Sequence, residues 1–241
     1  MATGTKRDHS GNPRAEAGPS GGQFHAMFER FRDELDEHHD RRERVVKASR
    51  DVTAQSKKIT ETLNEPLPPS IAQEVEKRMS SITKLLTDIA PDLAPPHRHR
   101  YAWQMRGLEE LIEALSFGHY LETQSLMTPQ EAQAAVPAPI PLTTDDYLLG
   151  VMDLFGELMR FATVRRGLVV GERSVLADLQ GWARAFEALP RGHSRDWVAK
   201  LEAMRQSVRK VEDLGYGLVV RGSERPGGWV PDGKDEEGQL A

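Results

Sequence analysis

The sequence predicts an all-α protein built as a bundle of seven helices. Apolar residues recur with a period of about 3.6 residues through most of the 241-residue chain, which places them along one face of each helix. No segment shows the alternation of apolar and polar residues that is typical of a β-strand. Prolines cluster at 66–69, 91–96 and 137–141, where they are expected to end one helix and separate it from the next.

The first predicted helix is the longest, because residues 24–63 contain neither Gly nor Pro. Its apolar stripe runs from Phe28, Phe31 and Leu35 to Ile59. The opposite face is rich in Lys and Arg. Such a face is most often solvated surface, and the alternative is a stripe that binds phosphates.

Six shorter helices are predicted to follow, several of them with a Ser or Thr at the N-cap. Residues 1–22 and 222–241 are rich in Gly, Pro, Ser and charge, so we expect disordered tails, the second one acidic, on either side of one domain at 23–221. The shorter helices are expected at 70–89 (cap Ser70), 97–125, 128–135 (cap Thr128), 144–164 (cap Thr144), 171–188 and 194–219 (cap Ser194).

Composition excludes several classes of protein. The absence of Cys rules out disulfides, thiolate metal sites and cysteine nucleophiles. With no signal-like or membrane-spanning apolar run, we expect a soluble protein of a reducing compartment. The net charge of −5 is not typical of a protein that coats nucleic acid, so RNA binding would need a local basic face or a basic partner.

The common catalytic motifs are missing as well. There is no glycine-rich phosphate loop, nucleophile elbow or His-Glu-x-x-His motif, and no Glu-x-x-His pair of the ferritin-like di-iron proteins. The histidines at 38–39 and the His-Arg-His at 97–99 are more typical of solvated surface than of a metal site.

Two acidic pairs on different predicted helices are the strongest candidates for chemistry. Glu110 and Glu113 lie three residues apart on the helix at 97–125, which is apolar on two sides and so is expected to pack between neighbours. Asp153 and Glu157 lie four residues apart on the helix at 144–164. Glycines at 150 and 156 of that helix suggest that another part of the chain closely approaches its backbone.

If the two pairs face each other, their carboxylates need a counter-charge. At about 5 Å and an effective dielectric constant of about 20, each like-charged pair repels by roughly 3 kcal/mol. Protons or a divalent cation must then neutralise the cluster, and an all-oxygen ligand set favours Mg²⁺ or Mn²⁺ over zinc. Because acidic pairs are common on exposed helices, the spacing alone does not establish such a site.

The segments that carry these acids resemble the translin superfamily, and within it the X-type subunits. The similarity covers 31–60, 107–126, 145–160 and 208–224 in the family's order, and is loose near 165–200. The linker at 127–142 is shorter than in animal members. The X-type motifs Glu-x-x-Glu and Asp-x-x-x-Glu match Glu110 with Glu113 and Asp153 with Glu157.

The resemblance implies a seven-helix bundle and a metal-dependent endoribonuclease that acts on single-stranded RNA. The four acids would be its catalytic residues and its Mg²⁺ ligands, with Mn²⁺ as an alternative ion. It also implies assembly with translin into a closed, roughly octameric shell in the cytoplasm and nucleus. Such a shell would act in passenger-strand removal during RNA silencing, or in trimming transfer-RNA precursor fragments.

Translin would then supply the basic surface that this acidic chain lacks. On this chain we expect Arg50, Lys57 and Lys58 of the first helix to guide the RNA backbone. Two alternatives stay open: a non-catalytic partner that stabilises the complex and modulates nucleic-acid binding, and a helical scaffold with no role in RNA. The number of metal ions and the identity of the general base are not determined by the sequence.

Overall fold

The computed structural model describes residues 24–64, 70–95, 97–137, 139–165, 169–170, 173–190 and 194–224. The chain divides into two compact units, residues 1–43 and 44–241. The tail predicted at 1–22 lies outside the described residues. Of the tail predicted at 222–241, residues 222–224 continue the last helix and the rest lie outside the described residues.

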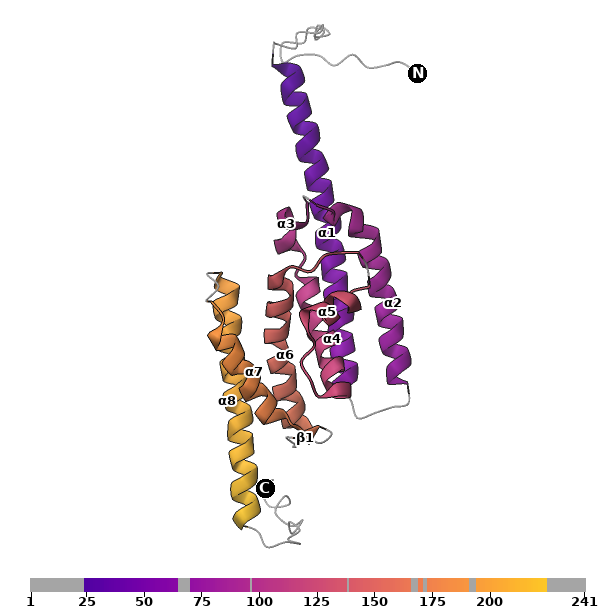
Figure 1. The fold of residues 1–241 in the computed structure, drawn as a ribbon. Coiled ribbons are helices and arrows are strands. Elements are labelled where there is room, and N and C mark those ends of the chain that lie inside the picture. Colours follow the sequence, from indigo (N-terminus) through magenta and orange to yellow (C-terminus); the bar gives the residue numbers. More distant parts are fainter. Residues whose placement is uncertain are drawn as a thin grey trace, which may run out of the picture. The chain divides into compact units, whose positions relative to one another are not determined.

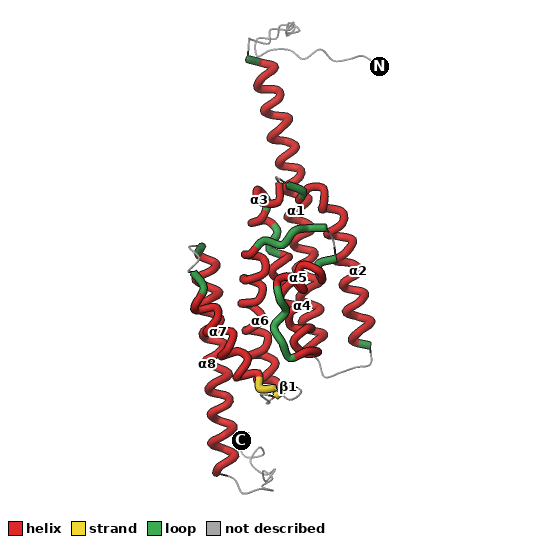
Figure 2. The backbone as a smooth tube through the Cα atoms, viewed as in Figure 1, coloured by secondary structure: helices red, strands yellow, loops and turns green. Residues whose placement is uncertain are grey.

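Helices make up most of the described residues, which confirms the all-α prediction (Figures 1 and 2). The strands β1 (Val169–Val170) and β2 (Arg173–Ser174) form only a two-residue antiparallel ribbon before α7, which therefore begins at Val175 rather than at 171. No helix in the described ranges is long and apolar enough to cross a membrane. The helices are α1 (His25–Asn64), α2 (Ile71–Ile89), α3 (His97–Arg100), α4 (Gly107–Thr123), α5 (Pro129–Ala135), α6 (Thr144–Arg165), α7 (Val175–Ala188) and α8 (Arg195–Glu224), with the 3₁₀ turns η1 (Ala90–Leu93) and η2 (Ala102–Gln104).

The long first helix is confirmed, but its apolar stripe is buried only in part. In the second unit, Val52 and Ile59 of this stripe are buried. In the first unit, Phe28, Phe31 and Leu35 of the same stripe are 64%, 49% and 66% exposed. The described part of that unit is a single helical segment, which has no second element of its own unit to pack against.

The helix predicted at 97–125 is interrupted, which corrects the expectation of one continuous element. It consists of α3, η2 and α4, and Trp103 in η2 is 64% exposed. Gly107 fixes the start of α4 against α1: its N–H donates to Ser49 Oγ at 2.9 Å, and a Cβ there would lie 2.5 Å from the Ser49 carbonyl oxygen. The residues before it turn away, and Arg98 of α3 pairs with Asp146 at the start of α6.

Helix α4 packs between α1 and α6, and α8 lies on the other side of α6 (Figure 1). This arrangement confirms the prediction that the helix is buried on two sides. The close approach expected at Gly150 is also present, because a Cβ there would lie 2.6 Å from the Glu109 carbonyl oxygen. The same expectation is wrong for Gly156, because no described atom outside its own helix backbone lies within 4 Å of a Cβ there. The buried residues of α4 include Leu108, Leu111, Ile112, Ala114, Phe117 and Tyr120.

Three of the four predicted N-cap residues are confirmed, and the one predicted for α6 is wrong by one residue. Thr128 forms a capping box, and Ser194 Oγ accepts a hydrogen bond from the Trp197 N–H at 3.1 Å. Ser70 occupies the N-cap of α2 without a side-chain hydrogen bond. At α6 the capping side chain is Thr143, one residue earlier than predicted, and its Oγ1 accepts a hydrogen bond from the Asp146 N–H at 3.1 Å.

Candidate functional site

The four predicted acids lie on two adjacent helices. Glu110 and Glu113 come from α4, and Asp153 and Glu157 come from α6. Burial, followed by the charges of Asp153, Glu110 and Glu157, raises the pKa of Glu113 to about 8. The other three carboxylates therefore lie close enough to Glu113 for their charges to act on it. Among the described residues, none forms an ion pair or side-chain hydrogen bond with Glu113.

Two of the other acids pair with flexible cations at the surface. Lys57 Nζ lies 3.5 Å from Glu110 Oε1, and Arg160 Nη2 lies 3.0 Å from Glu157 Oε1. The side chains of Lys57 and Arg160 are 60% and 56% exposed, so each pair contributes little to stability. Asn64 at the end of α1 donates a hydrogen bond to Glu157 Oε2 at 3.0 Å.

The fourth acid, Asp153, pairs with a partly buried lysine from α8. Lys200 Nζ lies 2.7 Å from Asp153 Oδ2, 2.6 Å from Glu109 Oε2 and 3.3 Å from the Leu149 carbonyl oxygen. Burial lowers the pKa of Lys200, but the two carboxylates outweigh it and raise that pKa. For Glu109 and Asp153 burial is the largest effect, and it raises both pKa values although Lys200 lowers them.

The sequence analysis missed both Glu109 and Lys200, although the position of each residue in its helix indicates a role in the site. Lys200 lies on the apolar stripe of α8, between the buried Trp197, Leu201 and Met204. A lysine in such a stripe needs a partner, because an unpaired buried charge is costly. Glu109 lies four residues before Glu113, so it shares the side of α4 that carries the predicted acids.

The donor set fits a divalent cation in its chemistry. Its ligands would all be carboxylate oxygens, which suit Mg²⁺ and Mn²⁺. Within the described ranges, however, no three acidic or His side chains already stand in a ligating arrangement. A cation would therefore have to draw the acids closer or bind some of them through water, as Mg²⁺ commonly does.

The predicted RNA-guiding residues lie on α1. Arg50, Lys57 and Lys58 are exposed, so their charges are accessible to a ligand. Lys57 also borders the acids through its contact with Glu110. The three side chains therefore share one helix, and one of them contacts the acidic cluster on α4.

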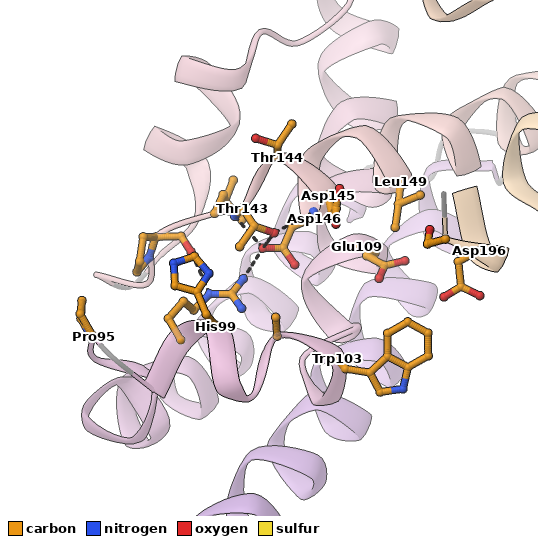
Figure 3. Close-up of a pocket in the computed structure, with 15 residues that line it drawn as sticks. Pro95, His99, Trp103, Glu109, Thr143, Thr144, Asp145, Asp146, Leu149 and Asp196 are labelled. Atoms are coloured by element: carbon orange, nitrogen blue, oxygen red, sulfur yellow. Dashed lines mark hydrogen bonds and ion pairs between the residues drawn. The ribbon is translucent and has the colours of Figure 1, made fainter. Parts of the chain in front are cut away.

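Glu109, which contacts Lys200, also lines a pocket of about 650 Å³. Figure 3 shows Glu109 among the residues that line this pocket. Arg98 lines the pocket and is only 2% exposed, so the prediction of a solvated surface cluster at 97–99 is wrong for this residue. Its guanidinium pairs with Asp146, and its Nε donates to the Pro141 carbonyl oxygen at 3.0 Å. Burial nevertheless raises the pKa of Asp146.

Comparison with known proteins supports one family across most of the chain. Residues 40–222 match the translin family. Translin-associated protein X from Mus musculus is 32% identical over 230 residues, which cover 83% of this chain and 79% of that protein. The homologue of that protein in Schizosaccharomyces pombe is 28% identical over 213 residues, covering 82% of this chain and 89% of its own length.

The fold has a match among solved structures. The crystal structure of apo-NeC3PO covers 78% of this chain and 94% of its own, with a TM-score of 0.61. The sequence identity is 17%, so this likeness concerns the fold alone.

Proposed function

The chain belongs to the translin family, and on that premise we propose that it is the catalytic subunit of a metal-dependent endoribonuclease that assembles with translin and cleaves single-stranded RNA. The observation that carries the proposal is the convergence of four acids from α4 and α6 around Glu113, whose pKa is raised to about 8. Strongly shifted carboxyl groups that face one another are typical of catalytic and cation-binding sites.

In this proposal Glu110, Glu113, Asp153 and Glu157 would hold Mg²⁺ or Mn²⁺, directly or through water. A bound divalent ion supplies an activated water and neutralises the charge that develops on the phosphodiester. Without a cation, Glu113 carries a proton at neutral pH, because its pKa is about 8. Its carboxyl group gives up that proton when it becomes a ligand, since ligating carboxylates are ionised.

The chain's own cations help to explain how RNA could approach an acidic subunit. Lys57 lies beside Glu110, and Arg50 and Lys58 are exposed on the same helix. With a net charge of −5, the chain would depend on its partner for most of the attraction to phosphate. The "translin-associated" relatives at 32% identity support translin as that partner.

A second candidate function is a non-catalytic subunit that stabilises the assembly and modulates RNA binding. It is favoured by one observation: Glu110, Asp153 and Glu157 already have basic partners, and no three acids in the described ranges stand ready to ligate an ion. A structural role for the acids as inter-helix ion pairs would require no cation.

Cleavage of a labelled single-stranded RNA by the co-expressed complex separates the two functions. The catalytic proposal expects cleavage with Mg²⁺ or Mn²⁺, none in EDTA, and recovery when the ion is restored. RNA that is bound but left intact under every metal condition would support the non-catalytic subunit instead.

A further inference from the structure

Lys200 differs from the other cations around the acids in its burial. Its side chain is 17% exposed, whereas those of Lys57 and Arg160 are 60% and 56% exposed. The two exposed side chains can move into solvent at little cost when a competing cation arrives, because surface ion pairs are weak. Lys200 is held more firmly, since leaving its position would deprive a largely buried ammonium group of all its partners.

The ammonium group of Lys200 is also fully satisfied. It has three N–H donors, and three acceptors surround it: Glu109 Oε2 at 2.6 Å, Asp153 Oδ2 at 2.7 Å and the Leu149 carbonyl oxygen at 3.3 Å. These contacts tie α8 to both α4 and α6. Lys200 takes only one oxygen of Asp153, and no described residue donates a hydrogen bond to Oδ1, which is left for another ligand.

We propose that Lys200 is a positioning residue that stays in place when a divalent cation binds, orienting Asp153 through Oδ2 and lowering the affinity of the acids for that cation by its fixed charge. Glu109 is the second carboxylate that holds Lys200 in place. The inference rests on the proposed function, because it concerns the same four acids.

Removing the charge of Lys200 should therefore have two opposite effects, one on cation binding and one on the rate of cleavage. Even at the dielectric constant of water, a unit charge and a divalent charge about 5 Å apart repel enough to change a binding constant roughly tenfold. Removing the ammonium should therefore tighten cation binding. It should also free the Asp153 carboxylate to rotate, which slows any reaction that needs it in one orientation.

Mn²⁺ is the probe, titrated into the full-length chain and followed by the EPR signal of the free ion. Lys200→Met is expected to bind Mn²⁺ roughly tenfold more tightly than wild type, and Lys200→Arg, which keeps the charge, to bind within about threefold of wild type. Arg160→Met is the matched control: it removes an exposed charge next to Glu157 and should change the affinity much less. If Lys200→Met does not fold, Lys200→Gln makes the same test with a polar neutral side chain.

The cleavage rate of the co-expressed complex at saturating Mn²⁺ supplies the second measurement. Lys200→Met should cleave more slowly than wild type although it binds the ion more tightly, a combination that general destabilisation would not produce. A wild-type rate, or an affinity that is unchanged or weaker, would overturn the role of Lys200.

The proposed function fails in a different way. If wild type binds Mn²⁺ and Glu113→Gln does not, the metal site stands whatever the Lys200 variants do. If wild type does not bind Mn²⁺, or Glu113→Gln binds it equally well, the metal site is wrong, and the role of Lys200 is wrong with it.

Discussion

Gly150 of α6 lies directly against the backbone of Glu109 in α4. A Cβ at residue 150 would lie 2.6 Å from the Glu109 carbonyl oxygen and 2.8 Å from Ile112 Cβ, closer than Cβ atoms approach such atoms in real proteins. The absence of a side chain here sets the spacing between the two helices that carry the four acids. The close packing of α4 and α6 at Gly150 therefore determines how far apart the acids of the candidate site lie.

Gly150→Ala should therefore destabilise the protein and also change the arrangement of the four acids. Alanine gains about 1 kcal/mol in helix propensity, but the clash is with backbone and a branched side chain, and overpacking of this kind typically costs about 1–3 kcal/mol. We expect a net loss of stability in urea unfolding. Cleavage by the assembled complex should fall as well, because the two helices must separate.

Gly156→Ala is the matched control on the same helix. Among the described residues, nothing beyond the backbone of α6 itself lies within 4 Å of a Cβ at that position. Only the propensity gain then applies, and stability should rise by up to about 1 kcal/mol. Equal losses in the two variants would show that the close approach at Gly150 is not what matters.

The fold could be predicted wherever local rules determine it. Helical periodicity and proline clusters gave the helices, and the two apolar sides of α4 correctly indicated that it is sandwiched. Periodicity could not show that α3 and α4 are separate helices, because the break depends on long-range contacts at Gly107 and Arg98. It could not show either that Phe28 is exposed, since a stripe is equally apolar whether or not something packs on it.

Replacing a central acid should abolish cleavage and leave the protein assembled. Glu113→Gln and Asp153→Asn keep the size of each side chain but remove a charge that a cation needs. The loss of cleavage activity should exceed the roughly 10–100-fold loss that follows removal of a residue that only hydrogen-bonds to a metal ligand. The measurements are RNA cleavage, RNA binding by filter retention and size-exclusion chromatography of the co-expressed complex.

Glu122→Gln is the control for these variants, because Glu122 lies on α4 but is exposed near its end. It should cleave like wild type. Full activity of both Glu113→Gln and Asp153→Asn would move the chemistry to another part of the assembly.

The raised pKa of Glu113 predicts a specific dependence of stability on pH. Burial and the neighbouring acids raise this pKa from 4.5 to about 8, so the folded state holds the proton more tightly than the unfolded state. The resulting stabilisation is complete below pH 4.5 and is lost as pH rises to about 8. Without divalent cations, the free energy of unfolding should lose at most a few kcal/mol through this group across that window.

Glu113→Gln isolates this contribution, because glutamine does not titrate. Urea unfolding of wild type and variant at pH 6 and pH 9 should show the variant gaining stability relative to wild type at the higher pH. A constant difference between the two proteins would mean that Glu113 titrates like an ordinary exposed glutamate.

The candidate site was only partly predictable, for a physical reason. Helical spacing identified two acidic pairs, Glu110 with Glu113 and Asp153 with Glu157, and the resemblance to the translin superfamily joined them into one group. In the structure the charges of the other three acids act on Glu113. Lys200 lies 47 residues from Asp153 along the chain, so no local spacing connects them. What the sequence does contain is a lysine within an apolar stripe, which indicates a buried partner without identifying it.

Arg50→Ala and Lys58→Ala should weaken binding of single-stranded RNA without affecting its sequence preference. If each side chain neutralises one phosphate, each substitution should reduce the slope of log affinity against log salt by about 0.7. Fluorescence anisotropy across a range of salt concentrations measures both effects on the co-expressed complex. Lys77→Ala removes an exposed charge from α2 and should leave the slope unchanged. Identical slopes in all three variants would mean that the basic face of α1 is solvated surface, and that the partner supplies the phosphate contacts.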